Sequence, residues 1–226
     1  MIPISDINPR RRFPYVTVAL IIINVIVFIY EMLNPNLNML IYKWGIVPKR
    51  LFTFGGREYL TLITSMFLHG NFAHIIGNML YLWIFGDNVE NFLGPAKFIL
   101  FYLLTGILAG LIHSVIHASS MIPTIGASGA IAGVMGAYFY LYPNAKVLAL
   151  TFLFFYVTII PVPAFIFLGI WFLMQLIPAF TSFGRLGAGI AFWAHVGGFI
   201  SGIVLIILMG GRRRRDYYYN RYWRRW

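Results

Sequence analysis

The chain contains no cysteine and few acidic residues, with six Asp and Glu among 226 residues. The absence of cysteine excludes disulfides and thiolate chemistry, and it leaves the redox compartment open. Charged residues of both signs make up only 10% of the chain, whereas hydrophobic residues make up 60%. A soluble domain of this length could not bury so much apolar side chain. The composition therefore predicts a membrane protein.

Long apolar runs follow one another along the chain, each near or above the roughly 18 residues that cross a bilayer core. The first run ends at Glu31 and Pro35, and no small-residue cleavage site is present, so we expect a retained span and not a signal peptide. No repeat of fixed period occurs. The runs lie at roughly 16–33, 72–93, 98–118, 125–142, 147–178 and 190–209.

The fifth run is too long for one straight helix, and Pro161 and Pro163 interrupt it. Proline removes a helical donor and collides with the preceding turn. We therefore predict a span at 162–178 and an aromatic-rich segment at 147–160 near the cytoplasmic interface. The alternatives are one steeply tilted helix, or seven spans with the C-terminus outside.

The net charge of +11 is concentrated near the two ends of the chain, with three arginines before the first span and seven after the last. Positive charge favours the cytoplasmic side, so both termini are expected there, and the number of spans is even. The loop at 34–71 then lies outside, although it holds four cations and one acid, against this trend. We expect this long loop to be structured and partly embedded.

The resulting prediction is an all-α membrane protein, a bundle of six transmembrane helices with a structured external loop between the first two spans. A cytoplasmic N-terminal segment covers 1–13, the six-helix domain covers 14–210, and a basic, aromatic cytoplasmic tail covers 211–226. Arginine interleaved with Tyr and Trp beside a last span is typical of an interfacial anchor, which we favour over a nucleic-acid site.

Polar side chains inside the spans are few and therefore informative. His74 and Asn78 are four residues apart in the second span and share one helical face. Ser128 begins the fourth span, and His195 lies in the sixth. A neutral imidazole can accept the proton of a serine hydroxyl and turn it into a nucleophile. Ser128 and His195 could make such a pair, and His74, Asn78 and the Ser128 N–H are the kinds of donor that an oxyanion needs.

Glycines surround these residues. Ser128 stands between Gly126 and Gly129, and Gly129 with Gly133 forms one small-xxx-small face on the fourth span. A second face is formed on the sixth span by Gly198 and Gly202. Faces of this kind allow two helices to approach closely in a membrane. Close approach is what a short hydroxyl and an imidazole on different helices require.

Four stretches together resemble the rhomboid family of intramembrane serine proteases. They occur in the order of that family on predicted spans two, four and six, and the resemblance covers roughly residues 14–210. The stretches are HGNFAHIIGNMLYLW, GDNVENFLG, GASGAIAG and AHVGGFISG.

The resemblance implies a Ser–His dyad without an acidic third member, in which Ser128 is the nucleophile and His195 the general base. It further implies that His74 and Asn78 hold the oxyanion and that Glu90 ties its helix to neighbouring groups. Rhomboids cleave other membrane proteins in or beside a transmembrane helix, in a water-filled hollow open to the outer face. The implied partners are transmembrane substrates and the lipid bilayer, with no nucleic acid, no metal and no cofactor.

Two positions depart from the family pattern. Leu60-Thr61 stands where many members have a Trp-Arg pair in the external loop, so the shape of this loop is open. Ala132 stands where some members carry an aromatic residue that packs on the catalytic histidine. Another group, such as an aromatic residue from a different span, must then orient His195. Gln175 is a polar residue near a span for which the sequence indicates no partner.

Other interpretations remain for the whole chain and for single residues. A catalytically silent rhomboid-like binder of transmembrane helices is the alternative function, and a transporter would need more charged groups along a path.

His113 and His117 are too few ligands for a metal, and His69 is expected to stabilise the junction before the second span. A prokaryotic plasma membrane is expected, whereas the natural substrate and oligomeric state stay open.

Overall fold

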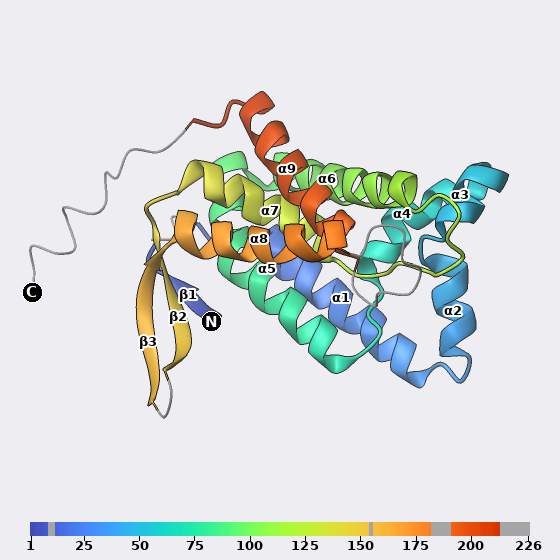
Figure 1. Ribbon diagram of the computed structural model, residues 1–226, viewed down its shortest axis with the longest axis horizontal. Helices are drawn as coiled ribbons and strands as arrows, with labels where there is room; N and C mark the ends of the chain where they lie inside the picture. The colour runs from blue at the N-terminus through green and yellow to red at the C-terminus, as the bar shows by residue number, and fades with distance from the viewer. Residues whose placement is uncertain (9–11, 154–155, 182–190, 213–226) are drawn as a thin grey trace, which may run out of the picture.

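The computed structural model describes residues 1–8, 12–153, 156–181 and 191–212 and is mainly helical. Within these ranges, six longer helices have bounds within three residues of the predicted spans, with 162–178 as the fifth, and pass alternately from one end of the bundle to the other (Figure 1). Among the described residues, α1, α6 and α8 are long and apolar enough to cross a membrane, and α7 and α9 are shorter apolar helices. The six are α1 (Tyr15–Leu33), α5 (Phe72–Leu93), α6 (Pro95–Ile116), α7 (Ser128–Leu141), α8 (Ala164–Thr181) and α9 (Phe192–Leu208).

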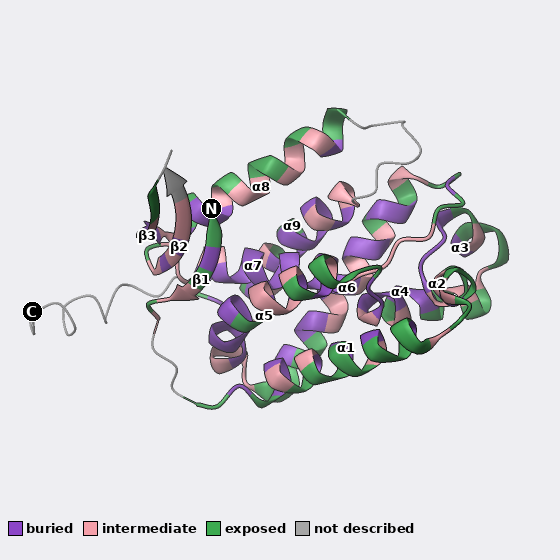
Figure 2. Cartoon of the chain, turned by 90° about the horizontal axis from the view of Figure 1, so that it is seen from below, coloured by how far each residue is buried: buried purple, intermediate pink, exposed green. Residues whose placement is uncertain are grey.

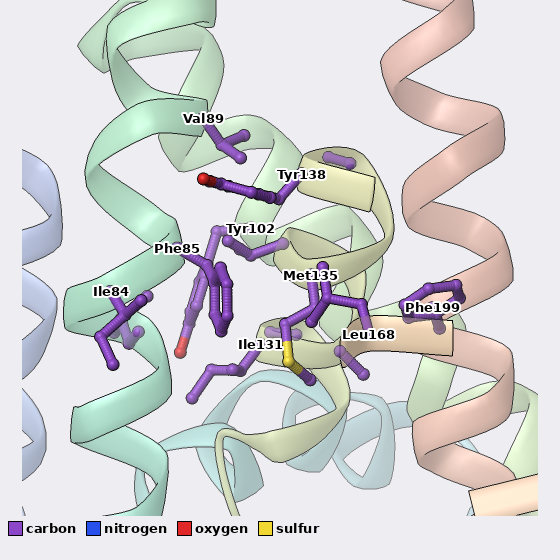
Figure 3. Close-up of a cluster of buried hydrophobic side chains, with 14 of the residues drawn as sticks. Ile84, Phe85, Val89, Tyr102, Ile131, Met135, Tyr138, Leu168 and Phe199 are labelled. Carbon is purple, nitrogen blue, oxygen red and sulfur yellow. The ribbon is translucent and has the colours of Figure 1, made fainter. Parts of the chain in front are cut away.

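Helix α7 lies at the centre of the bundle. Of its 14 residues, 11 are buried, whereas α1 exposes most of its outer face (Figure 2). Small residues and the absence of charge allow α7 to be surrounded on all sides, since nearly all of its side chains can be accommodated by apolar neighbours. Met135 and Tyr138 of α7 pack in the core with Phe85 of α5 and Phe199 of α9 (Figure 3).

Helices α7 and α9 touch through their backbones. A Cβ atom at Gly198 would collide with the carbonyl oxygen of Gly129, and one at Gly202 would collide with that of Gly133. The same holds in the other direction, because a Cβ atom at Gly136 would collide with the carbonyl oxygen of Phe199. The distance between the two helices therefore depends on the absence of side chains at these glycines.

A three-stranded antiparallel sheet lies at one end of the bundle, in the order β1-β2-β3 (Figure 1). It contains β1 (Ile2–Asp6), β2 (Lys146–Leu153) and β3 (Tyr156–Pro163). The all-α prediction is wrong here, because the aromatic-rich segment at 147–160 is a hairpin and the N-terminal segment supplies a strand. Valine, isoleucine, threonine and aromatic residues favour strands, and Pro161 and Pro163 fit because β3 is an edge strand. The predicted break is present, since α8 begins directly after Pro163.

Two carboxylates connect these elements. Asp6 of β1 accepts hydrogen bonds from the Tyr138 hydroxyl and from Asn88 Nδ2, so the sheet is bound to α7 and α5. The buried Glu90 of α5 accepts from the backbone N–H groups of Val16 and Thr17 at 3.0 and 2.8 Å. The first N–H groups of a helix have no partner within it. Glu90 therefore caps α1 and binds it to α5.

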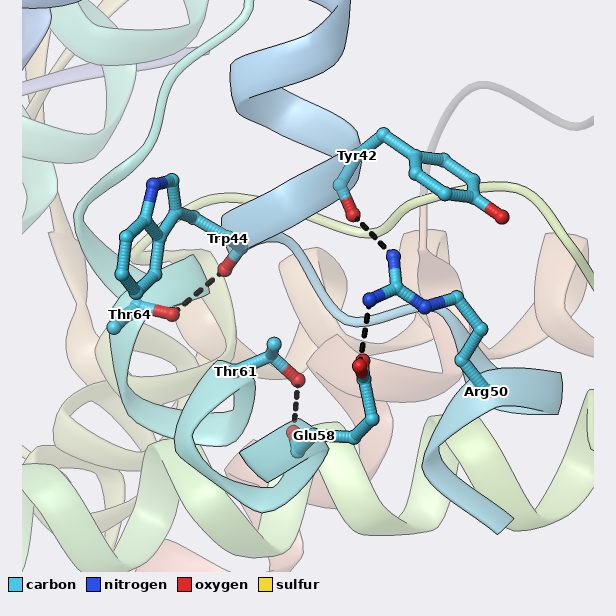
Figure 4. A network of polar contacts seen from close by, with 6 residues as sticks. All are labelled: Tyr42, Trp44, Arg50, Glu58, Thr61 and Thr64. Atoms are coloured by element: carbon cyan, nitrogen blue, oxygen red, sulfur yellow. Dashed lines mark hydrogen bonds and ion pairs between the residues drawn. The ribbon is translucent and has the colours of Figure 1, made fainter. Parts of the chain in front are cut away.

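The chain between α1 and α5 folds into short helices at the end opposite the sheet (Figure 1). The guanidinium of Arg50 donates to the Tyr42 carbonyl at 2.8 Å and to the Glu58 carboxylate at 2.6 Å, and the Thr64 hydroxyl donates to the Trp44 carbonyl at 2.7 Å (Figure 4). These bonds join successive turns, so the segment is a folded unit. Its elements are α2 (Leu37–Trp44), α3 (Pro48–Phe54), η1 (Gly56–Leu60), α4 (Thr61–Thr64) and η2 (Ser65–Phe67).

The contact between α7 and α9 can be tested with Gly202→Ala. We expect a loss of about 1–3 kcal/mol of stability, because the new methyl group meets a backbone carbonyl that cannot move aside like a side chain. Thermal unfolding in detergent measures the loss. Gly169→Ala in α8 is the matched control, since a Cβ atom there has no neighbour within 4 Å and alanine favours the helix. Equal midpoints for the two variants would contradict the prediction.

Candidate active site

Three helices begin at the end of the bundle that carries the short helices (Figure 1). His74 is the third residue of α5, Ser128 the first of α7 and His195 the fourth of α9. The alternating direction of the six long helices brings these three N-termini to the same end. Residues that lie far apart in the sequence therefore meet near one level of the bundle.

The side chains of Ser128 and His195 are in contact. Ser128 Oγ lies 2.7 Å from His195 Nε2, and both residues are partly exposed. The contact follows from the glycine packing, because Gly129 and Gly198 lie next to these residues and allow the two backbones to approach. An alcohol in this position can transfer its proton to the ring. The first turn of α7 also supplies N–H groups without a helical partner.

The other ring nitrogen of His195 is bound from α8. Nδ1 lies 2.8 Å from Gln175 Oε1, and the ring of Trp171, one turn earlier on α8, lies 6.0 Å away between centroids. The sequence indicated that some group must compensate for Ala132, and it left Gln175 without a partner. The four-residue spacing of Trp171 and Gln175 on one helical face is the signal that could have connected them.

His74 lies against the backbone just before Ser128. Gly126 has a φ of +120°, and a Cβ atom there would lie 2.6 Å from His74 Nε2 and 3.7 Å from Ser128 Oγ. Only glycine adopts this backbone conformation without strain. The N–H of Gly126 donates to the Ser65 carbonyl at 2.8 Å, which holds the loop before α7 in place.

Asn78 lies one turn after His74 on α5. Its side chain is buried, and Nδ2 has no hydrogen-bond partner within the described part of the chain. A buried amide donor without a partner is costly for stability. The described residues therefore leave the Nδ2 donor of Asn78 without an acceptor.

His69 and Glu31 form a second buried pair beside the site. Both oxygens of the Glu31 carboxylate accept from the His69 backbone N–H, at 3.1 and 3.0 Å, so the expected stabilising position of His69 at this junction is seen in the structure. Glu31 was expected only to end the first span, whereas it is buried within α1. Burial lowers the pKa of the His69 imidazole to about 4, with His74 acting in the same direction. This ring is therefore uncharged near neutral pH.

His113 and His117 have structural contacts. Their rings stack at 4.5 Å between centroids, and His113 Nε2 lies 3.0 Å from the Thr124 hydroxyl. Within the ranges that the structure describes, no three His, Asp or Glu side chains gather as a metal site.

Comparison with known proteins gives a consistent result. The family model described as Rhomboid domain matches residues 56–212. Rhomboid protein 1, mitochondrial, of Saccharomyces cerevisiae is 32% identical over 193 residues, which is 82% of this chain and 51% of that protein. Rhomboid protease GluP of Bacillus subtilis is 36% identical over 134 residues, which is 59% of this chain and 25% of that protein. RHOMBOID-like protein 12, mitochondrial, of Arabidopsis thaliana is 35% identical over 155 residues, which is 61% of this chain and 43% of that protein. The chain thus spans about half or less of the length of these relatives.

The conformation of the loop before Ser128 can be tested with Gly126→Ala. We expect a loss of about 1–3 kcal/mol of stability, because alanine is strained at this φ and its methyl group would displace His74. Thermal unfolding in detergent reports the change. Gly70→Ala serves as the control, since its Cβ atom would meet only Ile125, at 3.8 Å. A Gly126→Ala variant as stable as the control would show that the loop does not need this conformation.

Proposed function

This chain belongs to the rhomboid family, and on that premise we propose that it is an intramembrane serine protease with Ser128 and His195 as its catalytic dyad. Its substrates are other membrane proteins, cleaved in or next to their transmembrane segments. The observation that supports this proposal most directly is the 2.7 Å contact between Ser128 Oγ and His195 Nε2. A catalytically silent binder would not need a serine and a histidine in this contact.

In the proposed reaction, Ser128 Oγ attacks the carbonyl carbon of the scissile peptide bond while His195 Nε2 accepts the hydroxyl proton. The tetrahedral intermediate collapses as the imidazolium gives this proton to the leaving amine, and an acyl-enzyme remains. Water then attacks the ester with His195 again as the base, and the acid product leaves. Ser128 is regenerated, so protons and bonds balance over one turnover.

The oxyanion of the intermediate needs donors that are already in place. Asn78 Nδ2 supports this role as a buried donor without a partner among the described residues. His74 lies against Gly126 beside Ser128, and the Ser128 N–H belongs to the first turn of α7. One such donor typically lowers the barrier by about 3–4 kcal/mol.

The length of α7 supports a recessed site. At about 1.5 Å per residue its 14 residues span about 21 Å, which is less than the roughly 30 Å of a hydrocarbon core. A helix of this length cannot reach both faces of the membrane, and the proposal places its first residue, Ser128, below the outer face. The partial exposure of this residue supports access of water. A substrate helix must unwind locally to present a carbonyl there, since its own hydrogen bonds otherwise cover the backbone.

The topology is part of the same proposal. Six spans cover 14–210, the folded segment between α1 and α5 lies outside, and the site opens to that face. The segment at 1–13 and the tail at 211–226 are cytoplasmic, although residues 213–226 lie outside the described ranges. Two of the relatives are named as mitochondrial proteins and one comes from Bacillus subtilis. They therefore do not support the expected prokaryotic plasma membrane over another membrane, and this location stays a prediction.

The decisive experiment uses a fluorophosphonate probe and cleavage of a transmembrane peptide in detergent. We expect Ser128→Ala to abolish both signals and His195→Ala to lower them at least 100-fold, because each removes one member of a cooperating pair. Ser201→Ala is the control, as this hydroxyl donates to the Gly198 carbonyl away from the site. Two results would contradict the proposal. One is a folded wild-type protein that the probe never labels, and the other is labelling that persists in Ser128→Ala.

A further inference from the structure

We propose that Gln175 is a positioning residue that holds His195 in the orientation and tautomer needed by Ser128. This inference rests on the proposed protease function and adds a third member to the dyad. The third member is an uncharged amide from α8, a helix that carries neither Ser128 nor His195.

The ring of His195 lies between two oxygens. Gln175 Oε1 is 2.8 Å from Nδ1, and Ser128 Oγ is 2.7 Å from Nε2. In a neutral imidazole one nitrogen donates and the other accepts. A carbonyl oxygen can only accept, so the proton resides on Nδ1 and the lone pair of Nε2 faces the serine hydroxyl. This is the tautomer that can take the proton of Ser128.

An amide suits this place better than a carboxylate would in apolar surroundings. Gln175 and His195 are both partly buried. A carboxylate in such a place loses part of its hydration and, within the described ranges, has no cation beside it while the imidazole is neutral, whereas an amide oxygen accepts the same hydrogen bond without an added charge. The packing of α8 supports the arrangement, because Trp171 lies 6.0 Å from the His195 ring and 6.1 Å from that of Phe199. These contacts set the rotation of α8 and so direct Gln175 toward His195.

Two substitutions separate positioning from space filling. Gln175→Met keeps the length of the side chain but removes the acceptor, so we expect kcat to fall about 10- to 100-fold with KM and the unfolding midpoint nearly unchanged. Gln175→Glu restores an acceptor and should retain activity. Its negative charge stabilises the imidazolium, so the acid limb of the pH profile of kcat/KM moves to higher pH.

Met174→Leu is the matched control, because Met174 is the preceding residue of α8 and its side chain is exposed. It should behave as wild type in rate and pH profile. A Gln175→Met enzyme with wild-type kcat, or a Gln175→Glu enzyme with an unshifted acid limb, overturns the positioning role. Failure of the proposed function would look different, since the wild-type protein itself would then not be labelled at Ser128.

A second proposal comes from the charges of the folded segment between α1 and α5. We infer that a pocket of about 80 Å³ there binds the phosphate head group of an anionic phospholipid. Lys43, Arg50 and Arg57 line it together with Trp44 and Glu58. Glu58 pairs with Arg50 at 2.6 Å.

Two cations of the pocket have no anionic side chain beside them among the described residues. Lys43 and Arg57 lie over the ring of Trp44, at 5.1 and 5.6 Å from its centroid, and the described residues offer neither of them a carboxylate within ion-pair distance. Both side chains are exposed. A phosphodiester carries one negative charge, so it suits a pocket with this excess of positive charge.

The surroundings favour a lipid as the source of the phosphate. Exposed apolar side chains rim the segment, namely Met39, Phe52, Phe54, Tyr59 and Leu60. Apolar groups that enter the interface beside cations are typical of surfaces that bind anionic membranes. This interpretation also gives a physical reason for cations in a loop where the charge rule disfavours them.

The test measures binding of a fluorescent phosphatidylglycerol, relative to phosphatidylcholine, to the full chain in detergent micelles. Lys43→Gln/Arg57→Gln should lower the preference about 25-fold, at about fivefold per charge. Lys49→Gln/Lys97→Gln removes the same charge outside the pocket lining and should keep the preference. The readout needs no catalysis, so it is independent of the proposed function.

Three results overturn the lipid site. Equal loss in the two double variants indicates attraction by net charge alone. Displacement of the lipid by millimolar inorganic phosphate indicates a free-anion site. An unchanged lipid preference in Lys43→Gln/Arg57→Gln indicates that these two cations do not bind the head group.

Discussion

The approach of α7 and α9 is the constraint on which the rest of the bundle depends. Where the two helices cross, the space that a Cβ atom would need at Gly198 and Gly202 is taken by carbonyl groups of α7. In a membrane no hydrophobic force distinguishes a neighbouring helix from lipid, so this close van der Waals contact holds the pair together. Ser128 and His195 lie in the first turns of these helices. The distance between hydroxyl and imidazole is therefore set by backbone packing.

Acidic residues have an unusual use in this chain. Asp6, Glu31 and Glu90 are three of its six acidic residues, and each accepts hydrogen bonds from a different element of the bundle. Two of them receive backbone N–H groups, which would otherwise be unsatisfied in an apolar environment. A carboxylate at such a point connects helices without requiring a positively charged partner. Glu90 satisfies the first N–H groups of α1, and Glu31 satisfies the N–H of His69 just before α5.

Much of the helical architecture could be predicted, because a run of apolar residues long enough for a span has few other structures open to it. The break before α8 could also be predicted, since Pro163 cannot continue a helix. The sheet was missed because hydropathy does not separate a buried strand from a helix, and β1 pairs with β2 more than 140 residues away. The spacing of Trp171 and Gln175 places both on one face of α8, but the partner of that face depends on the rotation of α8 against α9, which no spacing reports.

Helix α8 is anchored on both sides of Gln175. Its first turns hold the buried residues Ala164, Phe167 and Leu168 and follow directly from the sheet. Near its other end Ala179 is buried, and the ring of Phe180 lies 5.1 Å from that of Trp193. Gln175 lies between these anchors, about 10 Å along the axis from Leu168. A change at either anchor that tilts the helix by about 10° would move the amide by about 2 Å and release the ring, so the steadiness of the base depends on contacts at both ends of α8.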